Sequence, residues 1–169
     1  MKNVAILGVS HFYQLGPPDC SVADTRMFQE AIRSIVREHE IELVAEELHP
    51  DYLYGRENST CVEIAKSEGA DHLYFDMSRS ERVKFNIVGP SDVKIMTGTG
   101  QIRAEDAAWT LNRSLSLREL YWITALLERN LWPALLIIGS DHVDSMERKL
   151  KTCNIDPKLV FAFWEPGIR

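Results

Sequence analysis

Asn3-Val4-Ala5-Ile6-Leu7-Gly8 is a compact apolar run that ends in glycine. Such a run is typical of a strand that is buried on both faces of a parallel sheet. Ala134-Leu135-Leu136-Ile137-Ile138, followed by Gly139, repeats this pattern and is the clearest strand of the chain. The two runs therefore predict a central sheet with helices on both of its faces.

Strands and helices alternate along the rest of the chain. We expect further strands at 41–45, 72–75 and 159–163, and helices at 21–39, 60–66, 104–130 and 143–153. The longest helix is expected to break near 114–116. The stretch 78–101 is expected to hold loops and a short helix or strand, because Gly89-Pro90 and 97–100 interrupt any period. The alternation predicts one α/β domain over residues 1–169, a three-layer sandwich with a mainly parallel central sheet.

The composition excludes several classes of protein. The 169 residues are 45% hydrophobic and 26% charged, which is ordinary for a folded domain, and the formal net charge is −6. Nucleic-acid binding needs a concentrated basic surface, which this chain lacks. No apolar stretch approaches the roughly 20 residues of a membrane span, and 4–7 is too short for the core of a secretory leader. The three cysteines lie far apart, so reduced thiols and a cytoplasmic location are expected.

A short motif, Gly-x-x-His, occurs twice. It forms Gly8-Val-Ser-His11 after the first strand and Gly139-Ser-Asp-His142 after the penultimate one. Ligands bind at the carboxyl edge of open parallel sheets, so the two imidazoles are expected to converge there. The alternative is that both histidines only cap helices or form hydrogen bonds in loops. Asp141, inside the second motif, either caps the following helix or contacts substrate.

Two carboxylates end the second predicted strand. Glu46 and Glu47 point to opposite faces because they are adjacent in a strand, so only one is expected in the crevice, and we slightly prefer Glu46. His11, Glu46 and His142 together offer the ligands of a divalent ion such as Mn²⁺, Zn²⁺ or Co²⁺. Without a metal, the same three groups offer a general base, an electrophile and an orienting group. The sequence does not separate these two cases.

These motifs, taken in order with Arg118-Glu119-Leu-Tyr-Trp-Ile123, resemble a known superfamily. It groups TraB/PrgY proteins, Tiki proteases, erythromycin esterases and haem-binding ChaN proteins, and the resemblance spans roughly residues 4–150. It implies that His11, one of the two glutamates, Arg118 and His142 share a cleft, with Glu119 supporting Arg118. The chain is far shorter than the esterases and has no secretion or membrane signal of the Tiki type, so no substrate is implied.

Two further polar residues are expected at the same sheet edge. Gln14 follows His11 by three positions, and Asp76 follows the third predicted strand. Together with Glu119 and Asp141 they are our candidates for substrate binding.

The leading hypothesis is a small cytoplasmic hydrolase that cleaves an ester or an amide (peptide) bond in a small molecule or peptide. His11 and one of the glutamates activate water, while Arg118 and His142 stabilise the oxyanion or hold the substrate. The alternative is a non-catalytic protein whose cleft binds a small ligand, haem or a metal. A third hypothesis is a homodimer formed through Phe161, Phe163 and Trp164, although we favour core packing for the first two.

Overall fold

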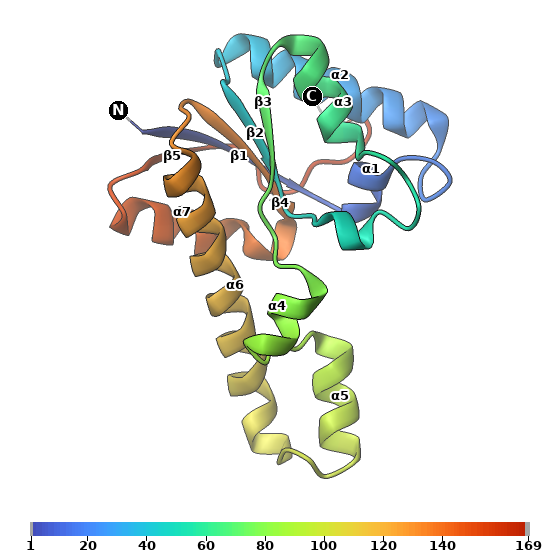
Figure 1. Ribbon diagram of the computed structural model, residues 1–169, viewed down its shortest axis with the longest axis vertical. Coiled ribbons are helices and arrows are strands. Elements are labelled where there is room, and N and C mark those ends of the chain that lie inside the picture. The colour runs from blue at the N-terminus through green and yellow to red at the C-terminus, as the bar shows by residue number, and fades with distance from the viewer. Residues whose placement is uncertain (1, 168–169) are drawn as a thin grey trace.

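A five-stranded parallel sheet forms the centre of the computed structural model, which describes residues 2–167 (Figure 1). The strands lie in the order β3-β2-β4-β1-β5, and every neighbouring pair is parallel. Their bounds are β1 Asn3–Val9, β2 Leu43–Glu46, β3 Asp71–Tyr74, β4 Ala134–Gly139 and β5 Asp156–Phe161. The two apolar runs, β1 and β4, lie side by side in the middle of the sheet. The predicted α/β fold with a parallel central sheet is confirmed.

Helices cover both faces of the sheet and make two hydrophobic cores. One face carries α1 (His11–Leu15), α2 (Val22–Glu38) and α3 (Thr60–Glu68), with Phe28 of α2 fully buried. The other face carries α6 (Ala107–Arg129) and α7 (Val143–Thr152), with Trp122 and Met146 fully buried. Strand residues alternate between the cores: Leu7 faces the first and Ile6 the second. This alternation decides which side chains reach each side of the sheet edge.

The stretch 78–101 holds more regular structure than its glycines and prolines predict. It contains α4 (Arg79–Lys84), which begins with a capping box made by Ser78 and Glu81, and α5 (Pro90–Gly98), which has proline at its first position. A 3-10 turn at Ala104–Asp106 follows. The helix α6 then runs through 114–116 without the expected break. We call α5 and the amino-terminal half of α6 the helical arm, which projects away from the sheet (Figure 1).

Close packing requires glycine at position 8, the first residue of the first Gly-x-x-His motif. A Cβ atom on Gly8 would lie 2.0 Å from the carbonyl oxygen of Ala162 and 2.7 Å from Val143 Cγ2. Since real Cβ atoms do not approach backbone this closely, only glycine fits where β1 passes beneath the carboxyl-terminal segment.

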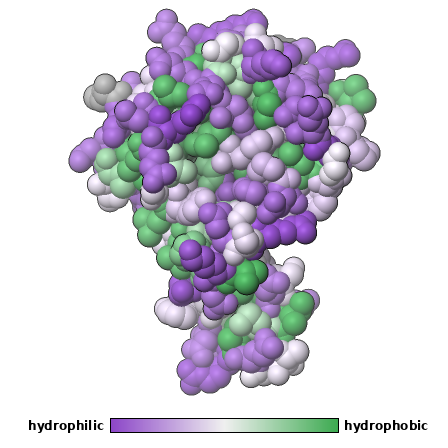
Figure 2. All heavy atoms as spheres, in the orientation of Figure 1, coloured by the Kyte–Doolittle hydropathy of each residue, from purple (hydrophilic) through white to green (hydrophobic). Residues whose placement is uncertain are grey.

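The last strand begins earlier than expected, and the residues that follow it do not form one exposed patch. Trp164 is only 2% exposed, and its ring centroid lies 5.1 Å from that of Tyr13 and 5.2 Å from that of Phe28. Trp164 therefore belongs to the core and is not available to a dimer surface, although Phe163 remains exposed. Hydrophobic side chains on the visible face are scattered over body and arm (Figure 2). Within residues 2–167, no helix is long and apolar enough to span a bilayer.

Candidate active site

The carboxyl ends of β1, β2 and β4 bring two histidines to one carboxylate. Glu47 Oε1 lies 3.6 Å from His11 Nε2 and 3.5 Å from His142 Nε2. His11 begins α1 directly after β1, and His142 ends the 3-10 turn Ser140–His142 directly after β4. The two glycine motifs, far apart in sequence, thus meet at the sheet edge. His11 is half exposed, whereas His142 and Glu47 are buried.

Glu47, not Glu46, occupies the position between the histidines. Its Oε2 accepts a hydrogen bond of 2.7 Å from the backbone N–H of Gly139, and its Oε1 accepts one of 2.7 Å from Arg118 Nη2. A Cβ on Gly139 would lie 3.1 Å from His11 Nε2 and 3.3 Å from Glu47 Oε2, so a side chain there would require these two groups to shift. Our preference for Glu46 as the crevice residue and metal ligand is therefore corrected: Glu46 points to the opposite face of β2.

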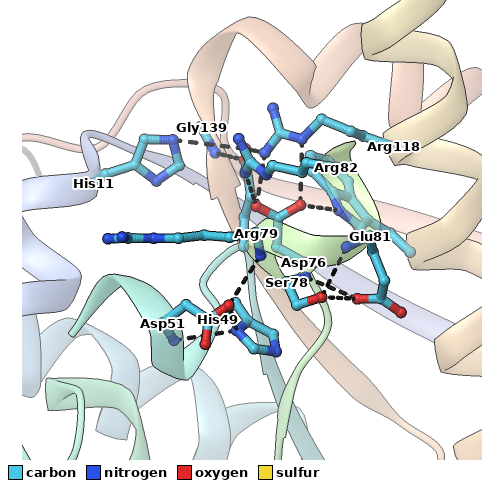
Figure 3. Close-up of polar contacts among 12 residues, drawn as sticks. His11, His49, Asp51, Asp76, Ser78, Arg79, Glu81, Arg82, Arg118 and Gly139 are labelled. Atoms are coloured by element: carbon cyan, nitrogen blue, oxygen red, sulfur yellow. Dashed lines mark hydrogen bonds and ion pairs between the residues drawn. The ribbon is translucent and has the colours of Figure 1, made fainter. Parts of the chain in front are cut away.

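Arg118 is held by a second carboxylate at the end of β3. Its Nε and Nη2 donate to Asp76 Oδ1 and Oδ2 at 3.2 and 2.9 Å, and Arg82 also pairs with Asp76 (Figure 3). Burial alone raises the pKa of Asp76 and lowers that of Arg118. The ion pair outweighs burial, so the pKa of Asp76 lies below its ordinary value and that of Arg118 above. Asp76 is buried and accepts hydrogen bonds on both carboxylate oxygens, so it positions Arg118, while its expected contact with substrate stays a prediction.

Glu119 orients His142 and does not support Arg118 as the resemblance implied. Its Oε1 lies 2.7 Å from His142 Nδ1 and accepts a 2.6 Å hydrogen bond from Ser145, while Lys149 Nζ lies 2.5 Å from Oε2. Burial raises the pKa of Glu119, but the hydrogen bonds from His142, Lys149 and Ser145 dominate and lower it to about 2. An ionised carboxylate only accepts hydrogen bonds, so Nδ1 of His142 carries a proton. The lone pair on Nε2 then faces Glu47.

Gln14 is also a supporting residue, because it is completely buried. Its Oε1 lies 2.9 Å from His11 Nδ1, and its Nε2 donates to Glu46 Oε2 at 3.2 Å. Glu46 is completely buried too and lies 2.8 Å from His72 Nε2. Gln14 therefore reaches His11 from behind and cannot touch a substrate in the cleft.

A cleft of ≈ 630 Å³ opens in front of the histidines. Leu111 and Leu115 of the helical arm and Phe163 form apolar parts of its wall, and Asp141 lies on its surface. Asp141 is thus the one predicted substrate-binding residue that the structure places in the cleft. A smaller cavity of ≈ 210 Å³, lined by Tyr52 and others, shares His11, Glu47, Arg82 and Arg118 with it.

Three residues of the site were not predicted from the sequence. Lys149 lies on α7, two turns after His142, which immediately precedes that helix; this spacing suggests a shared face but no chemistry. His72, in the edge strand β3, was not among the residues predicted for the site. Arg82 belongs to no recognisable motif, although it borders both cavities. Within residues 2–167, its Nε is the one buried side-chain nitrogen or oxygen without a hydrogen-bond partner.

Two of the distances that a divalent ion would require are found around Glu47. Ligands about 2.1 Å from a tetrahedral ion lie about 3.4 Å from each other. The two distances from Glu47 Oε1, 3.6 Å to His11 Nε2 and 3.5 Å to His142 Nε2, are close to such an edge. Across residues 2–167, however, no group of three His, Cys, Asp or Glu side chains has the geometry to hold a metal ion without rearrangement. Arg118 also competes for the same carboxylate oxygen.

Comparisons with protein-family models, with curated proteins and with solved structures each returned no match. The resemblance to the TraB, Tiki, erythromycin esterase and ChaN superfamily stays a prediction. The geometry of the cleft is therefore the basis for a functional proposal.

Proposed function

We propose that the protein is a hydrolase of ester or amide bonds that activates water between His142, Glu47 and His11. The observation that carries this proposal is that two imidazole Nε2 atoms flank one carboxylate oxygen at 3.5 and 3.6 Å. Both distances are too long for direct hydrogen bonds. They enclose a position with three acceptors, and a water there donates to two of them and keeps a lone pair for attack.

His142 is the general base of the proposed reaction. Its Nε2 takes a proton from the water as the oxygen attacks the carbonyl carbon, and the imidazolium that forms is stabilised by the carboxylate of Glu119 behind it. The same proton then passes to the leaving oxygen or nitrogen as its bond to carbon breaks. Arg118 uses Nε and Nη2 for the two carboxylates, which leaves its Nη1 to stabilise the oxyanion.

A substrate screen with paired variants tests the proposal. The wild-type protein, His142→Ala and His39→Ala are assayed on a panel of esters and amides, with circular dichroism to confirm folding. His39 is the matched control, because it caps the end of α2 outside the cleft. We expect hydrolysis by the wild type and His39→Ala, and a loss of about 10²- to 10⁴-fold in His142→Ala. Equal rates in His142→Ala, or no hydrolysis across the panel, would contradict the proposal.

A metal-assisted form of the same reaction is the second candidate, favoured by the match of the two distances to a tetrahedral edge. His11 and His142 would hold the ion through Nε2 and Glu47 through Oε1, and the ion would lower the pKa of a bound water. Elemental analysis of the wild type and the His11→Ala/His142→Ala double variant, with and without added Zn²⁺ or Mn²⁺, tests it. Metal bound by the wild type and lost in the variant is expected, and equal content in both would refute it.

The non-catalytic alternative uses the same cleft for a bound ligand. The apolar wall formed by Leu111, Leu115 and Phe163 supports it, because such walls bury the body of small molecules. For haem, a Soret band after reconstitution is the expected result, and its absence excludes haem.

A further inference from the structure

A chain of buried polar groups lies behind His11, on the face of β2 opposite to Glu47. It runs from His11 Nδ1 to Gln14 Oε1 over 2.9 Å, and from Gln14 Nε2 to Glu46 Oε2 over 3.2 Å. Glu46 Oε1 then meets His72 Nε2 at 2.8 Å and the hydroxyl of Ser59. Gln14 and Glu46 are both completely buried. The reaction proposed above uses none of these groups except His11.

The chain has a fixed direction. Ser59 Oγ accepts from the backbone N–H of Val62, so its own proton points to Glu46. A carboxylate only accepts, so the amide of Gln14 presents its NH₂ group to Glu46. The carbonyl of Gln14 therefore faces His11, and Nδ1 of His11 has to be the donor in that bond.

We infer that Gln14 is a positioning residue, anchored by Glu46, that holds His11 in the tautomer with its proton on Nδ1. The lone pair of Nε2 then faces Glu47, as it does in His142. The role of this tautomer in binding water or a metal rests on the proposed function, but the tautomer itself does not.

The two histidines receive the same orientation from different partners. Glu119 contacts His142 directly with a charge, whereas an uncharged amide separates His11 from the carboxylate of Glu46. Outer partners of this kind fix the tautomer and the ring orientation of functional histidines. Because Glu46 binds the NH₂ group of Gln14, the carbonyl of Gln14 faces His11 as a hydrogen-bond acceptor. His11 therefore has an acceptor behind it without a second buried carboxylate close to Glu47, and burying such a charge would be costly.

Nitrogen-15 NMR of the histidine side chains measures the tautomer directly. The protein is treated with a chelator and studied at a pH about two units above the ordinary pKa of histidine, near 6.5. We expect the wild-type His11 to carry its proton on Nδ1, the tautomer that a histidine side chain in water disfavours. In Gln14→Met the proton should move to Nε2, and in Glu46→Gln the Gln14 amide is free to turn over, with the same result. Gln101→Met, an exposed glutamine beyond α5, is the matched control and should leave His11 unchanged.

Each outcome decides the inference. A wild-type His11 with its proton on Nε2 overturns it, as does an Nδ1 proton that persists in both folded variants. If the variants unfold, the wild-type spectrum alone decides. A protein that hydrolyses nothing but shows the expected tautomer refutes the proposed function and leaves the inference standing. Where activity is found, Gln14→Met should lower kcat about 10- to 100-fold, the usual cost of losing such a partner.

Discussion

Replacement of Glu119 by glutamine is expected to destabilise the protein by about 3 kcal/mol at neutral pH. The native pKa of Glu119 is about 2 against an ordinary value of 4.5, and each unit corresponds to about 1.4 kcal/mol. The cause is the set of hydrogen bonds from His142, Lys149 and Ser145, which overcome the cost of burial. Glutamine keeps the shape of the side chain and removes the charge, so the variant approximates the protonated state.

The pH dependence of this difference provides a stricter test. A carboxyl with a lowered native pKa contributes stability that is complete above the unfolded pKa and is lost as the pH falls towards the native pKa. The difference between wild type and Glu119→Gln should therefore shrink from about 3 kcal/mol at pH 7 to about 2 kcal/mol at pH 3.5. Urea unfolding followed by circular dichroism measures both values. Glu147→Gln, a partly exposed residue of α7 that pairs with Lys151, is the matched control and should change stability by less than about 0.5 kcal/mol. A Glu119→Gln protein as stable as the wild type at pH 7, or a difference that does not shrink, would refute the reasoning.

Three other variants test the fold and the site. Gly8→Ala should prevent folding or strongly lower the midpoint of thermal unfolding, because its Cβ would overlap the carbonyl of Ala162, whereas Gly98→Ala has open space and should unfold like the wild type. Trp164→Ala should cost about 3–5 kcal/mol in urea unfolding and leave the sedimentation coefficient of the folded protein unchanged, since Trp164 is core. Arg118→Lys, which cannot bridge two carboxylates with a planar fork, should reduce hydrolysis more than tenfold while the protein stays folded; an unchanged rate would exclude Arg118 from the proposed reaction.

The sequence predicted the layers of this fold because its central strands are almost entirely apolar. The runs Val4–Leu7 and Ala134–Ile138 have no polar position, which indicates burial on both faces. The apolar character of β2 also prevented a correct prediction of which glutamate, Glu46 or Glu47, faces the cleft. In Leu43-Val44-Ala45 every residue is buried, so no alternation of polar and apolar positions reveals which face each one takes.

The supporting residues of the site were harder to predict than its centre. The repeated Gly-x-x-His motif singled out both histidines, since the carboxyl edge of a parallel sheet brings distant segments together. Gln14 was predicted as a polar residue near this edge and Glu119 through the family resemblance, but their partners depend on how helices pack against the sheet. The geometry of that packing places Glu119 behind His142 and Gln14 behind His11, and no local pattern of residue types encodes it.

The central claim is that Glu47 organises the reacting water, and the rate of hydrolysis by Glu47→Gln tests it most directly. The measurement compares the wild type, Glu47→Gln and Glu38→Gln, an exposed carboxylate at the end of α2, on a substrate that the wild type cleaves. The account predicts a loss of at least about 10²-fold in Glu47→Gln with the circular dichroism spectrum retained, and no loss in Glu38→Gln. A folded Glu47→Gln protein that hydrolyses the substrate at the wild-type rate would contradict it.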